Sequence, residues 1–90
     1  MYQFRDFYIP ERMMPGIERY VEKGIVPGDF LTAVIQNDLM AALGRADDEN
    51  LVNLAAYGSY LYNETPTGCW GSKKKMNEWC KAKRREHETP

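Results

Sequence analysis

The chain of 90 residues has one histidine, two cysteines and none of the common phosphate-binding loops. His87 stands near the polar C-terminal end, so neither a preorganised histidine base nor a histidine-activated nucleophile is expected. Cys69 and Cys80 lack the spacing of zinc ligands, and in a cytosolic chain they would stay reduced. No GxxxxGK or GxGxxG pattern occurs. We therefore expect a protein without catalytic residues, bound metal or cofactor.

Long apolar runs are also missing. A membrane span needs about 18 consecutive apolar residues, and a signal peptide needs an apolar stretch near its start. The opening MYQFRDFYIP contains an acid and an arginine where that stretch would stand. These absences predict a protein of the cytoplasm that does not contact a membrane.

The net charge of −1 combines two regions of opposite sign, because residues 1–72 carry −5 and residues 73–90 carry +4. The basic end either contacts an anionic partner or lies against the acidic body of this chain or a neighbouring copy. Lys73, Lys74 and Lys75 fall in the first turn of a predicted helix, where the helix dipole favours anions. They are either a candidate anion-binding site or side chains that extend into water. A nucleic-acid partner is the weaker interpretation, because the basic stretch is short and no recognition motif is present.

The pattern of apolar residues predicts an all-α protein built as one domain, residues 1–90. Residues 1–9 hold four aromatic rings before Ile9-Pro10, and proline disfavours a helical residue before it. We expect an extended aromatic arm there, covering the helices, reaching another subunit or forming one wall of a ligand pocket. A helical body over residues 10–83 and a frayed tail over residues 84–90 complete the predicted domain.

Helix starts and stops divide that body into a small bundle of three main helices and a short C-terminal helix. Asp29, Asp47 and Ser72 are N-cap candidates, Pro15 suits a first helical turn, and Gly24 is a left-handed stop. Such a small chain buries a limited core, which favours a homo-oligomer. The predicted helices cover residues 15–23, 29–43, 47–62 and 72–83.

Asp38 is the most unusual residue of the predicted second helix. A step of 100° per residue puts it near the centre of the apolar stripe that includes Leu31 and Ile35. A buried, unpaired carboxylate costs several kcal/mol, so Asp38 needs a partner. It either pairs with Arg19, Arg45 or a tyrosine hydroxyl, or it accepts hydrogen bonds from a ligand. The candidate ligand-binding residues are therefore Asp38, Asn37, Asn63, Tyr8, Tyr20 and Tyr62.

Three segments carry a resemblance to a known family. They read I-P-x-x-M from Ile9, G-I-x-x-Y-V-x-x-G-x-x-P-G-D-F-L-x-A-V-x-x-N-D-L from Gly16, and Y-L-Y-N-E-x-P-x-x-C-W-G-S from Tyr60. Over about residues 9–80 the chain resembles a family of small, largely uncharacterised proteins of tailed bacteriophages and prophages. After the CWGS element such relatives often continue S-P-E-K, whereas this chain has three lysines after Ser72.

The resemblance implies a function by association with phage biology. Phage accessory proteins of this size without catalytic residues commonly bind a target stoichiometrically. We expect a non-enzymatic inhibitor that binds a host protein in the host cytoplasm and counteracts host defence. The alternative is a sponge that sequesters a nucleotide-type defence signal in a polar and aromatic pocket, and a second alternative is weak association with nucleic acid.

Overall fold

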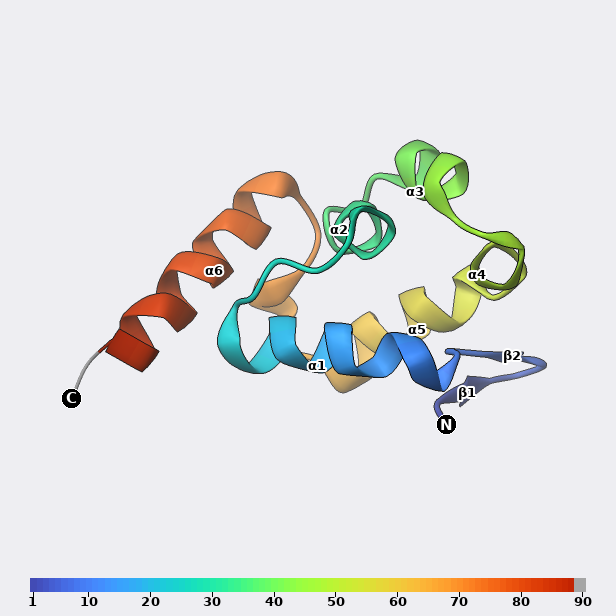
Figure 1. The fold of residues 1–90 in the computed structure, drawn as a ribbon, viewed down its shortest axis with the longest axis horizontal. Coiled ribbons are helices and arrows are strands. Elements are labelled where there is room, and N and C mark those ends of the chain that lie inside the picture. Colours follow the sequence, from blue (N-terminus) through green and yellow to red (C-terminus); the bar gives the residue numbers. More distant parts are fainter. Residues whose placement is uncertain (89–90) are drawn as a thin grey trace.

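The computed structural model describes residues 1–88, and they are mostly helical, as the sequence predicted (Figure 1). A short β-hairpin precedes the helices, one single turn of 3-10 helix comes directly before α1, and a second lies between α5 and α6. The elements are β1 (Gln3–Phe4), β2 (Phe7–Tyr8), η1 (Glu11–Met13), α1 (Met14–Lys23), α2 (Asp29–Ile35), α3 (Leu39–Arg45), α4 (Asp48–Val52), α5 (Leu54–Glu64), η2 (Thr67–Cys69) and α6 (Lys73–Glu88).

The aromatic N-terminal segment is a two-stranded antiparallel hairpin in which Gln3 faces Tyr8 and Phe4 faces Phe7. Arg5 in its turn adopts a positive φ of 55°. The hairpin packs on α5, where the hydroxyl oxygens of Tyr2 and Ser59 lie 2.6 Å apart. The rings of Tyr2 and Tyr60 meet edge to face with centroids 5.1 Å apart. Its aromatic rings therefore cover part of the helical core.

The predicted helix over residues 29–43 is wrong, because the chain breaks between α2 and α3. Asn37 adopts a left-handed φ of 59°, a conformation that asparagine tolerates better than most residues. The Asp38 carboxylate then accepts a hydrogen bond from the backbone N–H of Ala41 at 3.1 Å and caps α3. Asp38 is thus exposed rather than part of the apolar stripe.

A second break divides the predicted helix over residues 47–62 into α4 and α5. Asn53 stands at the junction and is buried. Its side-chain amide donates to the Glu49 carbonyl at 3.0 Å, and its Oδ1 accepts from the Tyr8 N–H at 2.9 Å. With six α-helices in residues 1–88, the predicted bundle of three main helices and one C-terminal helix is not confirmed.

The C-terminal helix is longer than predicted. Ser72 caps it, as expected, by accepting from the N–H of Lys75 at 3.1 Å. The helix then continues to Glu88 instead of ending near Lys83, so most of the predicted frayed tail is helical. Residues 89–90 of that tail lie outside the described residues.

Two clusters of buried side chains form the core. Both cysteines are reduced and belong to the second cluster, where burial raises the pKa of the Cys69 and Cys80 thiols. The first cluster consists of Ile9, Ile17, Phe30, Leu31, Ala33, Ala42, Ala56 and Tyr57. The second consists of Tyr20, Ile35, Leu61, Cys69, Met76 and Cys80.

Close contacts fix α6 against α1. The Trp79 indole N–H donates to the carbonyls of Tyr20 and Val21, each at 3.2 Å. Gly24 ends α1 with a φ of 68°, and a Cβ at this position would stand 2.7 Å from the Lys83 Cβ. Only glycine therefore satisfies both the left-handed turn and the close approach of α6.

The buried hydrogen bond from the Tyr57 hydroxyl to Asn50 Oδ1, 2.5 Å long, allows a test of this core. Tyr57→Phe leaves the Asn50 oxygen without that donor, so we expect the free energy of unfolding to fall by about 1–3 kcal/mol. Tyr62→Phe is the matched control, because the Tyr62 side chain is 72% exposed. Urea denaturation of both variants checks the prediction. Equal stability of the two variants would contradict it.

Candidate functional site

The structure distributes the predicted tyrosine ligands over separate places. Tyr20 is fully buried, and its hydroxyl donates to the Cys69 carbonyl at 2.7 Å. Burial raises the pKa of Tyr20, which stays neutral and joins α1 to η2. Tyr62 projects into solvent with its ring centroid 6.3 Å from that of Trp70. Tyr8 lies in the hairpin, half-buried beside α4.

The predicted polar residues of the site also lie on the surface. Asn63 donates from its amide to the Ser59 carbonyl at 3.0 Å, within α5. Asp38 caps α3, and Arg45, one of its proposed partners, donates instead to the Asp29 carbonyl at 3.2 Å. The interpretation of Asp38 as a buried carboxylate is therefore wrong. The ligand-binding roles of these residues stay predictions.

Asn37 and Asp38 do share one hollow, which lies between the α2–α3 turn and α5. Its volume is about 170 Å³. Small-molecule sites usually enclose about 300–1,000 Å³, so this hollow suits one inserted side chain better than a whole nucleotide. The other residues that line it are Ala33, Val34, Leu39, Ala42, Leu54 and Gly58.

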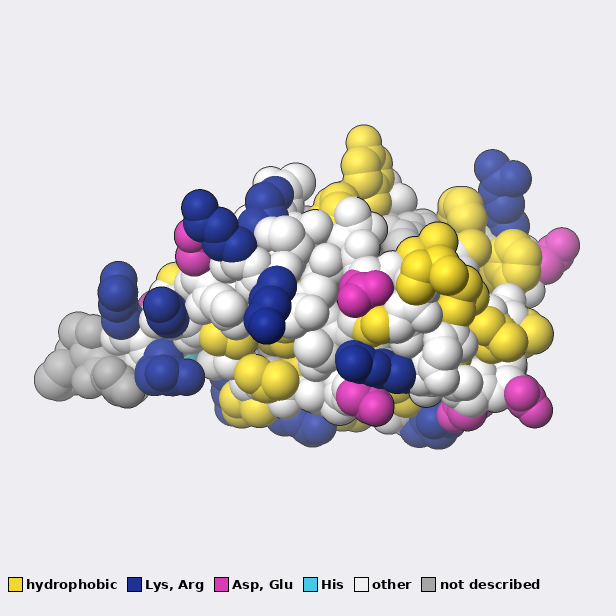
Figure 2. All heavy atoms as spheres, turned by 90° about the horizontal axis from the view of Figure 1, so that it is seen from above, with side chains coloured by type: hydrophobic (Ala, Val, Ile, Leu, Met, Phe, Trp, Pro, Cys, Tyr) yellow, Lys and Arg dark blue, Asp and Glu magenta, His cyan; other side chains and the backbone are white. Residues whose placement is uncertain are grey.

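An exposed apolar face, which we call the α3 face, borders this hollow. It consists of Leu39, Met40 and Leu43, which are 58%, 76% and 40% exposed. Helical geometry places the three side chains within an arc of about 100°. Leu51 and Val52 of α4 are also exposed, and Figure 2 shows hydrophobic side chains gathered over the end of the molecule that holds α3 and α4. Exposed apolar surface of this kind is typical of an interaction site.

The sequence does not predict the α3 face, because its apolar pattern indicates one helix over residues 29–43. The signal that could have revealed it is the pair Asn37-Asp38, which combines a left-handed residue with an N-cap. A restart at Leu39 changes which residues face the core. Ala42 is then the buried residue of α3, and the larger side chains turn outward.

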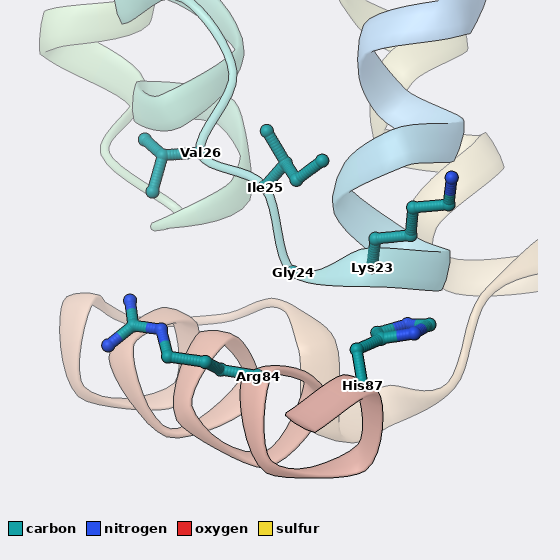
Figure 3. A pocket seen from close by; sticks show the side chains of 6 residues that line it. All are labelled: Lys23, Gly24, Ile25, Val26, Arg84 and His87. Atoms are coloured by element: carbon teal, nitrogen blue, oxygen red, sulfur yellow. The ribbon is translucent and has the colours of Figure 1, made fainter. Parts of the chain in front are cut away.

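A larger hollow of about 570 Å³ lies where the end of α1 faces α6 (Figure 3). Lys23, Arg84 and His87 surround it together with Ile25 and Val26, and the His87 ring lies against the backbone with Nε2 3.3 Å from the Glu22 carbonyl oxygen. Lys23 and His87 stand in the last turns of α1 and α6, where the helix dipole favours positive charge. The charge of Lys23 therefore has a structural explanation within the fold.

The predicted anion-binding lysines are exposed at the start of α6. The Lys75 side chain passes close to Gly71, since a Cβ there would lie 3.3 Å from Lys75 Cδ. Among the side chains of residues 1–87, no acid forms an ion pair with Lys73, Lys74 or Lys75. Their charge is thus left uncompensated at the positive end of the helix dipole.

A polar cluster that the sequence did not predict joins the hairpin to α4. Arg12 Nη2 donates to carboxylate oxygens of Asp47 and Glu49, each at 3.0 Å, and the Tyr8 hydroxyl donates to Glu49 at 2.8 Å. The Asn50 N–H and then Arg12 lower the pKa of Asp47, whereas the Tyr8 hydroxyl and then Arg12 lower that of Glu49. The same hydrogen bond raises the pKa of Tyr8. Arg12 and Asp47 remain about half-exposed, so these ion pairs contribute modestly.

Comparisons with known proteins give no match: no family model, no curated protein and no solved structure is similar to this chain. Within residues 1–88, no helix combines the length and the apolar composition needed to cross a membrane.

Substitution of Asp38 distinguishes a helix cap from a charge partner. Asp38→Ala removes the acceptor for the Ala41 N–H, and we expect the free energy of unfolding to fall by about 0.5–2 kcal/mol. Asp38→Asn keeps a capping oxygen, so the free energy of unfolding should fall by only a few tenths of the loss expected for Asp38→Ala. Urea denaturation measures both values. An equal loss in the two variants would mean that the charge, and not the cap, is what stabilises the fold.

The lowered pKa values of Asp47 and Glu49 predict a pH dependence of stability. Groups whose pKa falls on folding stabilise the native state above their unfolded pKa values, and this contribution disappears as the pH drops through the folded ones. Thermal unfolding between about pH 5 and pH 3 should therefore show a smaller loss of stability for Arg12→Gln than for the wild type. The exposed Arg19→Gln is the control and should behave as the wild type does.

Proposed function

We propose that this chain is a non-enzymatic binding protein that docks onto a protein partner through the α3 face. The observation that carries the proposal is the exposure of Leu39, Met40 and Leu43 on one short helix. Water contact of such side chains is unfavourable, and a partner would remove it. The adjoining hollow of about 170 Å³ would receive one side chain of that partner.

The energy of association indicates how much surface is needed. Complete burial of a large apolar side chain gains about 1.5–3 kcal/mol, whereas association costs about 4–15 kcal/mol in lost freedom of motion. The three side chains of the α3 face, already partly covered, would recover only part of that cost. Leu51 and Val52, 42% and 64% exposed on the neighbouring α4, extend the surface and belong to the proposed contact.

The resemblance to bacteriophage proteins supports a host protein as the partner. Binding would then occur in the host cytoplasm during infection, with counteraction of host defence as its outcome. A second copy of the chain is the competing occupant of the same face, and it would make the protein the homo-oligomer that its small core favours.

The alternative function, a sponge for a nucleotide-type signal, finds support in one observation. The hollow between α1 and α6 has a volume of about 570 Å³, within the range of small-molecule sites, and Lys23 and Arg84 border it. The site first proposed for the sponge has less support, since Tyr8 lines a different hollow from Asn37 and Asp38. A panel of cyclic nucleotides tests the sponge, because a true ligand at a hundredfold its Kd adds about 2.7 kcal/mol of stability.

Met40→Asp tests the α3 face. The position is the second of α3, where an acid is compatible with the helix dipole, so the fold should be retained while a charge enters the contact. We expect affinity-tagged wild-type protein to capture one host protein at near-equal stoichiometry, and Met40→Asp to reduce the captured amount at least tenfold. Quantitative mass spectrometry of the captured material measures the effect.

Val26→Asp is the matched control for this experiment. Val26 is 62% exposed, like Met40, but it lies in the loop after α1 beside α6. Capture by this variant should equal that of the wild type. Equal loss in both variants would contradict the proposal, and a change from oligomer to monomer in Met40→Asp, seen by light scattering, would identify a second copy as the partner.

A further inference from the structure

One side of α6 carries a set of five cations, and Arg84 at its edge also borders the hollow near the end of α1. A step of 100° per residue places Lys73, Arg84, Lys81, Lys74 and Arg85 within an arc of about 120°, and all five are exposed. The opposite face holds Met76, Trp79 and Cys80 and packs on the rest of the protein. At about 1.5 Å per residue, this helix of 16 residues is about 24 Å long. We call this set of five side chains the α6 basic face.

The length of α6 is what assembles this face. The sequence predicts a helix that ends near Lys83 and a frayed tail that includes Arg84 and Arg85. In the structure they continue the helix and fall on the same side as the lysines of its first and middle turns. The lysines in the sequence alone form a short basic stretch, whereas the helix places cations on one side of its first turn and of its C-terminal half.

The acidic residues of α6 are fewer than the cations of the α6 basic face. Glu86 pairs with Lys83 at 3.3 Å, outside the arc, and Glu78 lies at the border of the arc. Glu88, at the end of the helix, is the one acidic position within the arc. Lys73, Lys74, Lys81 and Arg84 have no ion-pair partner among the side chains of residues 1–87. Lys73 and Lys74 also oppose the helix dipole, an arrangement that an external anion would relieve.

The three acidic side chains at the start of α4 are too distant to prevent binding of an anion at this face. Asp47, Asp48 and Glu49 belong to α4 and its cap, which lie at the opposite end of the molecule from α6 (Figure 1). The molecule is 43 Å long, whereas charges in physiological salt are screened over about 8 Å. Figure 2 shows the same separation, with Lys and Arg side chains gathered along the α6 end. The net charge of −1 therefore does not describe the potential near α6.

We propose that the α6 basic face binds the phosphate backbone of double-stranded nucleic acid, independently of base sequence. A duplex carries one negative charge per about 1.7 Å of its axis. This regular series of phosphates matches cations held on a rigid helix better than the scattered carboxylates of an acidic protein would. Trp79, the aromatic residue of α6, lies on the packed side with its N–H bonded to backbone carbonyls, so this face offers no ring on which single-stranded bases could stack. The proposal is independent of the α3 face.

Fluorescence anisotropy with two unrelated DNA duplexes of about 20 base pairs tests the proposal, at salt concentrations from 50 to 200 mM. Both duplexes should bind with Kd values within about twofold, weakening linearly with the logarithm of the salt concentration. Lys74→Gln combined with Lys81→Gln should weaken binding at least about tenfold at 50 mM salt and lower the salt slope by about 2. Lys73→Gln combined with Arg84→Gln should give the same effect.

Arg5→Gln combined with Arg45→Gln is the matched control, because it removes the same charge from the hairpin turn and the end of α3. It should leave the Kd within about twofold of the wild type. Equal weakening in control and test variants would overturn the proposal, as would no binding at 50 mM salt or equal affinity for single strands. Displacement of the duplex by polyglutamate at equal charge would overturn it as well, and would assign the face to an acidic protein.

Discussion

The reversal of the chain at Asn37 and Asp38 is the constraint on which the exposed surface depends. A left-handed residue followed by a capping carboxylate ends α2 and restarts the chain as α3 in a new direction. Without that reversal, one longer helix would carry Leu39, Met40 and Leu43 at other angles to the core. The capping bond costs little to form, since both groups are local and exposed, yet it decides which apolar side chains meet water. The α3 face and the hollow beside it both follow from this turn.

The contact between α1 and α6 has the corresponding role at the other end of the molecule. Trp79 bonds to carbonyls near the end of α1, and Gly24 lets the two helices approach to a distance that a side chain would block. These contacts fix the rotation of α6 about its own axis. Because Met76 and Cys80 must face the core, Lys73, Lys74 and Lys81 are held on another side of the helix. Packing of a few apolar residues thus places a whole set of charges.

Local signals explain which parts of this fold the sequence predicts. Gly24 ends α1, and Asp47 and Ser72 cap α4 and α6, because each acts through bonds to its own neighbours in the chain. The break at Asn53 involves Tyr8, 45 residues away, and such a contact leaves no trace in local periodicity. The candidate site was harder to predict for the same reason. The predicted position of Asp38 depends on a helical repeat that continues through residues 36–38, where the structure has a turn. The predicted surroundings of Asp38 were wrong for that reason. Tyr20, a predicted pocket residue, is instead buried, and its hydroxyl donates to the distant Cys69 carbonyl.

The separation of charge along the molecule has a consequence for how it meets other macromolecules. With excess positive charge on α6 and excess negative charge around α4, the protein has an electric dipole moment roughly along its 43 Å axis. In the field of a highly charged polymer such a molecule rotates while it is still diffusing, so that encounters begin with one end far more often than chance would allow. The end that arrives last points away from the polymer. Orientation on approach would therefore keep the apolar surface of α3 accessible, and two macromolecules could be held at once without competing for space.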